Sequence, residues 1–221
     1  MFVRRISLLL LFAGVLAVYL LNGRFVESTD TFGNELLPIS IVQRGALDFD
    51  QYYLQPDANG AYPTGDAAVA PGSVPKEFAY RVTPDVPERS VPWWFHRNAD
   101  GHVVSTYPIA PGLLNTPVFA VASLIGVDLP NNVIELTHIT SSVIAALSVL
   151  AMYLCLSQLT RHRTAVFLTV AFAFGTEVWS LNSRSLFQHG ASVLFITTAL
   201  AALLAPRMSD KQLAEAHAHA H

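Results

Sequence analysis

The chain has 221 residues, of which 52% are hydrophobic and only 13% are charged. Ordinary soluble domains carry about 25% charged residues, so the composition excludes a soluble enzyme or a secreted domain. A net charge of −3 without any Lys/Arg-rich run gives no indication of a nucleic-acid partner. Cys155, the single cysteine, lies in an apolar run, and we interpret it as a buried apolar residue.

The first apolar run, residues 6–21, follows Arg4 and Arg5. A secretory signal peptide begins in the same way but ends in small residues of the A-x-A kind. The residues that follow this run, Asn-Gly-Arg-Phe-Val, offer no such cleavage site. We therefore interpret residues 1–24 as an uncleaved first transmembrane anchor.

Residues 25–137 are expected to form a large extracytoplasmic loop. Near its start, the pattern predicts a short juxtamembrane helix that runs toward Gln43 and stops at Gly45. We expect this helix to lie along the membrane, with an apolar flank of Leu36, Leu37, Ile41 and Val42. The candidate caps at its start are Ser28, Thr29 and Asp30.

The middle of this loop contains two further signals. Residues 56–75 hold seven Pro or Gly residues, which predicts a surface excursion. Residues 93–97 and 102–106 flank Asn-Ala-Asp-Gly, and Asp-Gly between β-prone runs predicts a hairpin. The paired Trp93 and Trp94 have two interpretations, at the lipid headgroups or packed inside the loop.

Residues 109–127 are uncharged over 19 positions, which passes the length test for a membrane span. Pro111, Gly112 and Pro117 interrupt the first half of this stretch, and proline kinks a helix. We interpret the segment as an interfacial or re-entrant helix, broken or tilted near Pro117, that does not cross the bilayer.

Three later runs predict a three-helix transmembrane bundle over residues 138–206, followed by a cytoplasmic tail, 207–221. Residues 139–159 carry no charge and are long enough to cross ~30 Å of hydrocarbon at ~1.5 Å per residue. Residues 164–183 contain one charge, and residues 186–205 contain none. With the anchor, the expected fold is an all-α membrane protein of about four transmembrane helices.

The distribution of basic residues supports four spans rather than five. Four spans put three basic pairs on the cytoplasmic side, whereas a fifth span at 109–127 would place the last two outside, against the positive-inside rule. The pairs are Arg4/Arg5, Arg161/Arg163 and Arg207/Lys211. The protein is thus expected in a cell membrane as a multi-pass protein.

Several polar residues are expected at the outer edge of the bilayer, where ionisable groups are candidates for function. Each also has a structural interpretation. Asp30 is either a helix cap or a reactive carboxylate. Glu177 is either part of a site or paired with Arg184, and His189 is either a ligand-binding residue or an interhelical contact. The His-rich end, residues 216–221, is interpreted as a disordered or appended tail rather than a metal site.

Three stretches together resemble the bacterial polyprenyl-phosphate-sugar-dependent membrane glycosyltransferases of the C type (GT-C), such as the protein mannosyltransferase and aminoarabinose transferase groups. The stretches are Asp-Thr-Phe-Gly-Asn-Glu-Leu-Leu-Pro-Ile-Ser at 30–40, Asp-Gly through Ser-Thr-Tyr-Pro at 100–108, and Phe-Gly-Thr-Glu-Val-Trp-Ser at 174–180 with Leu-Phe-Gln-His-Gly at 186–190. The chain has no Walker loop or dinucleotide motif, which agrees with a lipid-linked rather than a nucleotide-linked donor.

The resemblance implies that Asp30 is the catalytic residue, because the family's acidic residue of the first outer loop is catalytic. It further implies substrate-binding roles for Glu35, Tyr107, Gln188 and His189. No cofactor is expected, although a divalent metal near Asp30 is compatible with the resemblance. The implied partners are the bilayer and a polyprenyl-phosphate sugar, with the active face outside a bacterial inner membrane.

Two alternatives remain open at this point. The family's membrane module has more spans than the four expected here, so the chain is interpreted as an N-terminal portion that works with a membrane protein supplying the remaining helices. It is alternatively a non-catalytic relative that serves as a subunit or scaffold. A transporter is disfavoured because no expected span has a charge at its middle.

Overall fold

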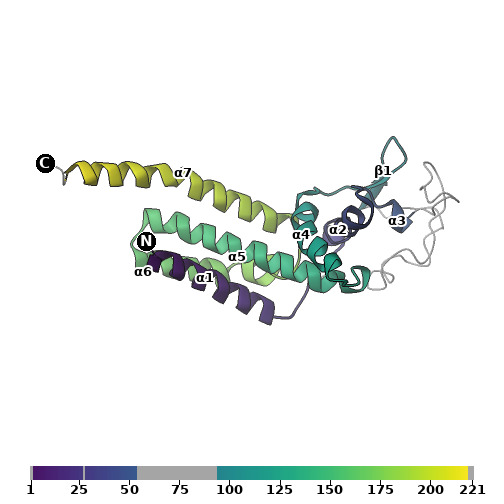
Figure 1. Ribbon diagram of the computed structural model, residues 1–221, viewed down its shortest axis with the longest axis horizontal. Helices are drawn as coiled ribbons and strands as arrows, with labels where there is room; N and C mark the ends of the chain where they lie inside the picture. Colours follow the sequence, from purple (N-terminus) through teal and green to yellow (C-terminus); the bar gives the residue numbers. More distant parts are fainter. Residues whose placement is uncertain (1, 27, 54–93, 219–221) are drawn as a thin grey trace. The chain divides into compact units, whose positions relative to one another are not determined.

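The computed structural model describes residues 2–26, 28–53 and 94–218 (Figure 1). The described residues are mostly helical, at 74%, and they contain one two-stranded antiparallel sheet. Contacts divide the chain into two compact units. Unit 1 comprises Met1–Val26, Ser141–Ser185 and His189–His221, and unit 2 comprises Glu27–Thr140 and Leu186–Gln188. The expected excursion at 56–75 and Trp93 lie outside the described residues.

Unit 1 is built from helices with a narrow core of small side chains. Its elements are α1 (Phe2–Leu21), most of α5 (Val133–Leu159), α6 (His162–Gly175), a π-helical turn (Val178–Asn182) and α7 (Gln188–Ala218). Tyr19 of α1 packs with Ala145 and Ala146 of α5 and with Ala173 of α6, and its hydroxyl donates to the Ala173 carbonyl at 2.9 Å. Small residues at such contacts let helix backbones approach closely, as in membrane bundles.

The outward faces of the unit 1 helices are apolar. Exposed large side chains include Leu9 and Leu10 on α1, Phe167 and Val170 on α6, and Phe195, Ile196 and Leu203 on α7. By length and composition, two helical stretches of the described chain can cross a membrane, Pro130–Leu159 and Gln188–Ala205. The apolar part of α1, Leu8–Leu21, is shorter.

Helix α6 is shorter than the stretch 164–183 that the sequence indicated. It ends at Gly175, and Thr176 has an extended backbone with φ −128° and ψ −178°. The Thr176 hydroxyl donates to the Phe172 carbonyl at 2.7 Å and accepts from the Val178 N–H at 3.2 Å. This side chain therefore closes one helix and opens the π-helical turn, which a hydropathy pattern does not reveal.

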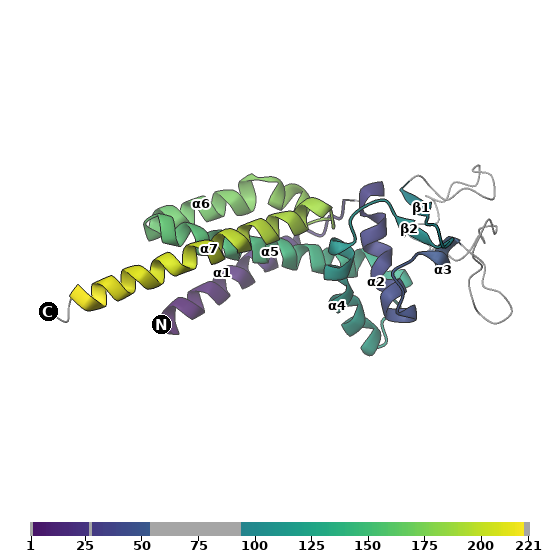
Figure 2. The ribbon, with the colours of Figure 1, turned by 90° about the horizontal axis from the view of Figure 1, so that it is seen from above.

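Three helix ends of unit 1 that carry basic residues lie together. The start of α1, the connection between α5 and α6, and the last third of α7 lie at the same end of the unit (Figures 1 and 2). These segments carry the three basic pairs of the sequence. Helix α7 continues to Ala218, so residues 207–215 of the expected tail and the first half of its His-rich end, 216–218, are helical, while residues 219–221 lie outside the described residues.

Unit 2 packs two helices side by side with a short hairpin. Helices α2 (Phe32–Arg44) and α4 (Ala110–Leu124) lie next to each other in both views, and α3 (Asp50–Tyr53), β1 (Phe95–Arg97) and β2 (Val103–Ser105) complete the unit (Figures 1 and 2). Turns of 3-10 helix precede α2 at Thr29–Thr31 and α5 at Pro130–Asn132. The core includes Phe32, Leu36, Phe49, Phe95, Val103, Phe119 and Val133.

Helix α2 is the buried centre of unit 2. Its residues from Phe32 to Ser40 are all buried, so Leu36 and Leu37 of the expected membrane-facing flank pack inside the protein. The expected stop is confirmed, because Gly45 ends the helix at φ 68° with its N–H bonded to the Ile41 carbonyl at 2.9 Å. A left-handed glycine in this position is a common helix terminator.

The predicted hairpin is confirmed. Phe95 pairs with Ser105 and Arg97 with Val103 in antiparallel register. The Asn98 side chain organises the reversal by accepting the N–H groups of Asp100 and His102 at 3.0 and 2.9 Å. Trp94 stacks on Phe32 with ring centroids 5.9 Å apart, so the packed interpretation holds for this tryptophan.

Helix α4 forms where the interfacial helix was expected and is continuous through Pro117. Its 15 residues span about 22 Å at ~1.5 Å per residue, less than the ~30 Å of a bilayer core. A Cβ on Gly112 would lie 2.9 Å from the Leu37 Cδ2 atom, so the absence of a side chain lets α4 approach α2. Leu124 and Ile125, at the other end, are 86% and 74% exposed.

Candidate functional site

Asp30 lies in the 3-10 turn that leads into α2 and is not the cap of that helix. The N-cap is Thr31, which makes no side-chain cap bond. The turn is held locally, because the Ser28 Oγ accepts the Asp30 N–H at 3.3 Å and the Thr31 hydroxyl donates to the Ser28 carbonyl at 2.8 Å. The capping interpretation of Asp30 is therefore wrong, and its half-buried carboxylate is directed to another partner.

That partner is Tyr107, whose hydroxyl donates to the Asp30 Oδ1 atom at 2.7 Å. Two of the sequence-predicted site residues thus come together from positions 77 apart. Hydrogen bonding to Asp30, followed by burial and the negative charge of Asp30, raises the pKa of the Tyr107 hydroxyl above its ordinary value. The Tyr107 hydroxyl therefore keeps its proton and donates a hydrogen bond to the carboxylate. This bond fixes the position of one carboxylate oxygen.

The Tyr107 backbone is positioned by the hairpin. Its N–H donates to the Ser105 Oγ at 3.0 Å, and Ser105 is the last residue of β2. A Cβ on Gly33 would lie 2.6 Å from the same Oγ, closer than non-bonded atoms approach. Gly33 therefore allows the start of α2 to contact the end of β2. This contact fixes the position of the Tyr107 backbone, which follows β2.

The other predicted substrate-binding residues differ from one another in their surroundings. Glu35 is fully buried in α2, so it is not open to a substrate in this structure. Gln188 begins α7 and is half-buried, whereas His189 is exposed. Gln188 belongs to unit 2 and His189 to unit 1.

A buried amide network that the sequence did not indicate connects the elements of unit 2. The Asn115 amide of α4 donates to the Asn34 carbonyl at 3.3 Å and to the Thr137 hydroxyl at 3.1 Å. The Asn34 amide in turn donates to the Leu186 carbonyl at 3.1 Å. Buried polar networks of this kind specify one packing of a core. Here the network ties the segment before Gln188 to α2.

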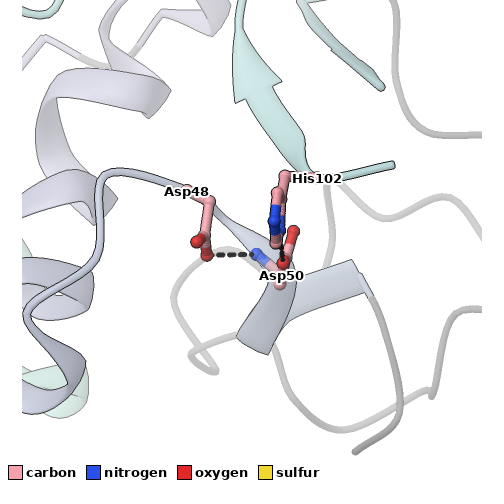
Figure 3. A group of neighbouring side chains, drawn as sticks. All are labelled: Asp48, Asp50 and His102. Carbon is pink, nitrogen blue, oxygen red and sulfur yellow. Dashed lines mark hydrogen bonds and ion pairs between the residues drawn. The ribbon is translucent and has the colours of Figure 1, made fainter. Parts of the chain in front are cut away.

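A second acidic site follows the end of α2. Asp48, Asp50 and His102 offer ligand atoms that all lie within 4.8 Å of one another (Figure 3). Asp50 is fully buried. Its Oδ2 atom lies 2.6 Å from the His102 Nδ1, and its Oδ1 accepts the Val103 N–H at 2.7 Å. The carboxylate therefore joins the start of α3 to the start of β2.

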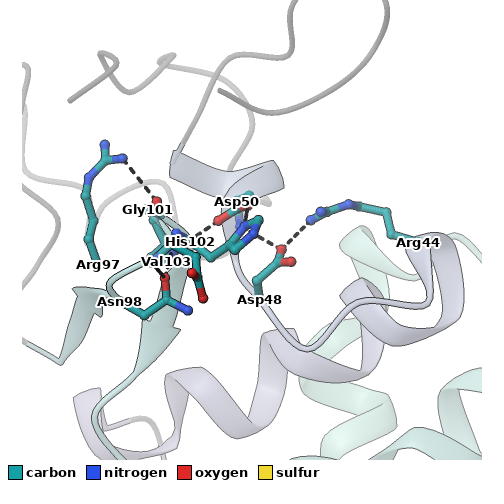
Figure 4. Close-up of polar contacts among 9 residues, drawn as sticks. Arg44, Asp48, Asp50, Arg97, Asn98, Gly101, His102 and Val103 are labelled. Atoms are coloured by element: carbon teal, nitrogen blue, oxygen red, sulfur yellow. Dashed lines mark hydrogen bonds and ion pairs between the residues drawn. The ribbon is translucent and has the colours of Figure 1, made fainter. Parts of the chain in front are cut away.

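Basic groups lie against both carboxylates of this second site. Arg44, in the last turn of α2, donates to the Asp48 Oδ1 at 2.7 Å, and the Asp50 N–H reaches the same atom at 3.2 Å (Figure 4). The hydrogen bond to Asp50 raises the pKa of the His102 imidazole, with smaller contributions from neighbouring carboxylates. The sequence offered little signal for this cluster, because His102 is 52 positions from Asp50.

Unit 1 has its own polar cluster near the π-helical turn. The Ser183 carbonyl accepts the hydroxyls of Ser141 and Ser142 at 3.2 and 3.1 Å. Arg184 donates to the backbone carbonyls of Arg24 and Ser180. Within the described part of the chain, Arg184 forms no ion pair with Glu177, so the paired interpretation of Glu177 does not hold in this structure.

Asn182 is a second feature of that cluster that the sequence did not indicate. It is 2% exposed, and neither its amide nitrogen nor its oxygen has a hydrogen-bond partner among the residues that the structure describes. A buried side-chain amide in this state is uncommon in native structures.

Comparison of the chain with models of protein families, with curated proteins and with solved structures finds no match. The functional argument therefore depends on the residues and their geometry.

Proposed function

We propose that the chain is a GT-C-like membrane glycosyltransferase, or the N-terminal module of one, that transfers a sugar from a polyprenyl phosphate to an acceptor hydroxyl outside the membrane. Asp30 is the base in this proposal, and Tyr107 positions it. The observation that carries the proposal is the 2.7 Å hydrogen bond between these two residues, since the family resemblance had singled out both independently.

The surface of unit 1 supports the membrane part of the proposal. Exposed Phe, Leu, Ile and Val side chains on α1, α6 and α7 are costly in water but favourable against lipid. The three segments with basic pairs lie at one end of the unit (Figures 1 and 2), as expected of a multi-pass protein that obeys the positive-inside rule. A bacterial inner membrane with unit 2 outside is the location that we propose.

The surface of α4 supports an interfacial position for unit 2. Pro111, Gly112, Asn115, Phe119 and Ala122 form its buried face. Its exposed side chains, by contrast, are also apolar and include Leu113, Val121 and Leu124. A short helix with apolar side chains on its outer face is suited to the boundary between headgroups and acyl chains.

The proposed reaction is a single displacement. The acceptor oxygen attacks the anomeric carbon and forms the new glycosidic bond, while Asp30 takes the proton from that oxygen. The bond between the anomeric carbon and the phosphate oxygen breaks, and its electron pair leaves with the polyprenyl phosphate. One displacement inverts the anomeric configuration. A positioned general base of this kind contributes about 10²–10⁴-fold to the rate.

Substitution of the base tests the proposal. The full chain is incorporated into lipid nanodiscs, supplied with a polyprenyl-phosphate sugar and an acceptor, and followed by release of the polyprenyl phosphate. Asp30→Asn keeps an oxygen that accepts from Tyr107 but removes the base, so turnover should fall about 10²–10⁴-fold while thermal unfolding is unchanged. Asp100→Asn, in the exposed hairpin turn, is the matched control and should retain wild-type turnover.

Equal turnover by wild type and Asp30→Asn would remove Asp30 from the mechanism. Absence of turnover in wild type, even with a membrane protein that supplies further helices, would favour the second candidate, a non-catalytic subunit or scaffold. The full burial of Glu35 is the observation that favours this alternative. A residue that was predicted to bind substrate lies instead on the buried face of α2.

A further inference from the structure

The cluster of Asp48, Asp50 and His102 has the composition of a metal site. Two carboxylates and one imidazole are ligands shared by Zn²⁺ and Mn²⁺. In a tetrahedral bound state, donor atoms at about 2.0–2.2 Å from one ion lie about 3.3–3.6 Å from each other. The three residues already hold their donor atoms within 4.8 Å (Figure 3), so only small side-chain movements separate the observed arrangement from coordination.

We propose that these three residues form a divalent metal site on unit 2, suited to Zn²⁺ or Mn²⁺. It is distinct from the metal near Asp30 that the family resemblance allowed, and it does not depend on the proposed transferase activity. His102 Nδ1 and Asp50 Oδ2 are two of its ligand atoms, and Asp48 supplies the third.

Neighbouring groups hold both aspartates in place through their Oδ1 atoms. Asp50 Oδ1 accepts the Val103 N–H at 2.7 Å, and Asp48 Oδ1 accepts the Arg44 guanidinium at 2.7 Å and the Asp50 N–H at 3.2 Å (Figure 4). Hydrogen bonds of this type orient metal-binding carboxylates and keep their second oxygens directed at the ion. The site is therefore largely organised before an ion arrives.

The three residues differ in their exposure, so the site has both a fixed buried ligand and a side that is open to solvent. Asp50 is fully buried, whereas the side chains of His102 and Asp48 are 41% and 16% exposed. An ion can thus arrive from solvent, and coordination positions on the solvent side stay open to water, as in sites with three protein ligands. Binding requires the 2.6 Å contact between His102 and Asp50 to open by about 0.7–1 Å.

Local charge determines how tightly the site binds an ion, and the ligand types determine which ions it favours. The two carboxylates carry two negative charges, but the Arg44 guanidinium neutralises part of this field, so we expect moderate rather than very tight affinity. Ca²⁺ and Mg²⁺ prefer sets of oxygen ligands, and the imidazole disfavours them relative to Zn²⁺ and Mn²⁺. A bound ion would connect the segment after α2, through Asp48 and Asp50, to the hairpin, through His102.

Isothermal titration of the chelator-stripped full chain tests this site. Imidazoles are zinc ligands in general, so all variants are made in a background in which the terminal His217, His219 and His221 are changed to Ala to exclude any contribution from the tail. We expect about one Zn²⁺ per chain in this background, and a more than tenfold loss of affinity in His102→Gln and in Asp48→Asn, since losing one ligand of a three-residue site has at least the effect of losing an outer-shell partner.

His96→Gln is the matched control, because it removes an exposed imidazole from β1 of the same hairpin and should leave affinity unchanged. Circular dichroism and thermal unfolding of the metal-free variants establish that each is folded. The Mn²⁺ electron paramagnetic resonance spectrum gives a second readout, because the immobilised-ion signal should disappear in His102→Gln. Zinc affinity that is equal in the background, His102→Gln and His96→Gln proteins would overturn the proposal, as would the absence of binding in the background protein.

Discussion

The segments before and after helix α2 each present an aspartate, and the two carboxylates have opposite surroundings. Asp30, before the helix, is half-buried and accepts the hydroxyl of Tyr107. Asp50, after the helix, is fully buried and bonded to a backbone N–H and an imidazole. Substrate can reach a half-buried carboxylate without breaking the fold, whereas the buried one holds two elements together. The comparison agrees with the proposed role of Asp30 as a base and gives Asp50 a structural role in the metal-free protein.

The largest effect expected from this comparison is on folding. Asp50→Ala leaves the buried Val103 N–H without its acceptor, which should lower the free energy of unfolding by about 1–3 kcal/mol. Asp30→Ala should cost less than about 1 kcal/mol, because water can replace the carboxylate at a half-buried position.

Chemical denaturation in detergent measures both values, and hydrogen exchange locates them. The peptide that contains Val103 should lose protection in Asp50→Ala and keep it in Asp30→Ala. Asp100→Ala, in the exposed turn, is the control for loss of a carboxylate as such. An Asp30→Ala protein that is as unstable as Asp50→Ala would show that both aspartates are structural.

A smaller effect is expected at the contact that positions Tyr107. Gly33→Ala places a Cβ 2.6 Å from the Ser105 Oγ and 3.0 Å from its Cβ, so the Ser105 side chain must rotate or β2 must shift, at a cost of about 1–3 kcal/mol. Because the Ser105 Oγ accepts the Tyr107 N–H, the proposed transferase activity should fall as well. Gly14→Ala in α1, where a Cβ meets nothing within 4 Å, should change neither stability nor activity. Wild-type stability in Gly33→Ala would contradict the close approach.

Much of unit 2 could be predicted from local sequence signals. Gly45 stops α2 because its left-handed backbone is one that few residues other than glycine adopt, and the Asp-Gly pair marked the hairpin. Such features depend on neighbouring residues alone. The resemblance also paired Asp30 and Tyr107 with one function, although only the structure brings their side chains together.

The missed features depend on contacts between distant residues or on a single side chain that overrides a pattern. His102 joins Asp50 across 52 positions, and Asn115 joins Asn34 across 81, so no local window contains either pair. Hydropathy predicted helix through residues 164–183, but the Thr176 hydroxyl ends α6 by bonding to backbone groups. Leu36 and Leu37 read as a membrane flank because apolar side chains suit lipid and core equally.

The smallest expected effect is the pH dependence of the Asp50–His102 contact in metal-free protein. The hydrogen bond to Asp50 raises the pKa of His102 above its ordinary value of 6.5, and burial opposes this only in part. A group whose pKa is higher in the folded state favours folding when protonated. This contribution is therefore complete below pH 6.5 and is lost as pH rises through the higher pKa of the folded state.

Unfolding free energies of wild type and His102→Gln, measured with a chelator from pH 5.5 to 9, isolate this contribution as their difference. Because the His102 side chain is 41% exposed, solvent screening should keep the change below about 1 kcal/mol. Asp48 and Asp100 also raise the pKa, so Asp100→Asn should narrow the pH window slightly without removing the effect. A difference that grows with rising pH would mean that the neutral form of His102 binds Asp50 more strongly, which would contradict the raised pKa of this imidazole.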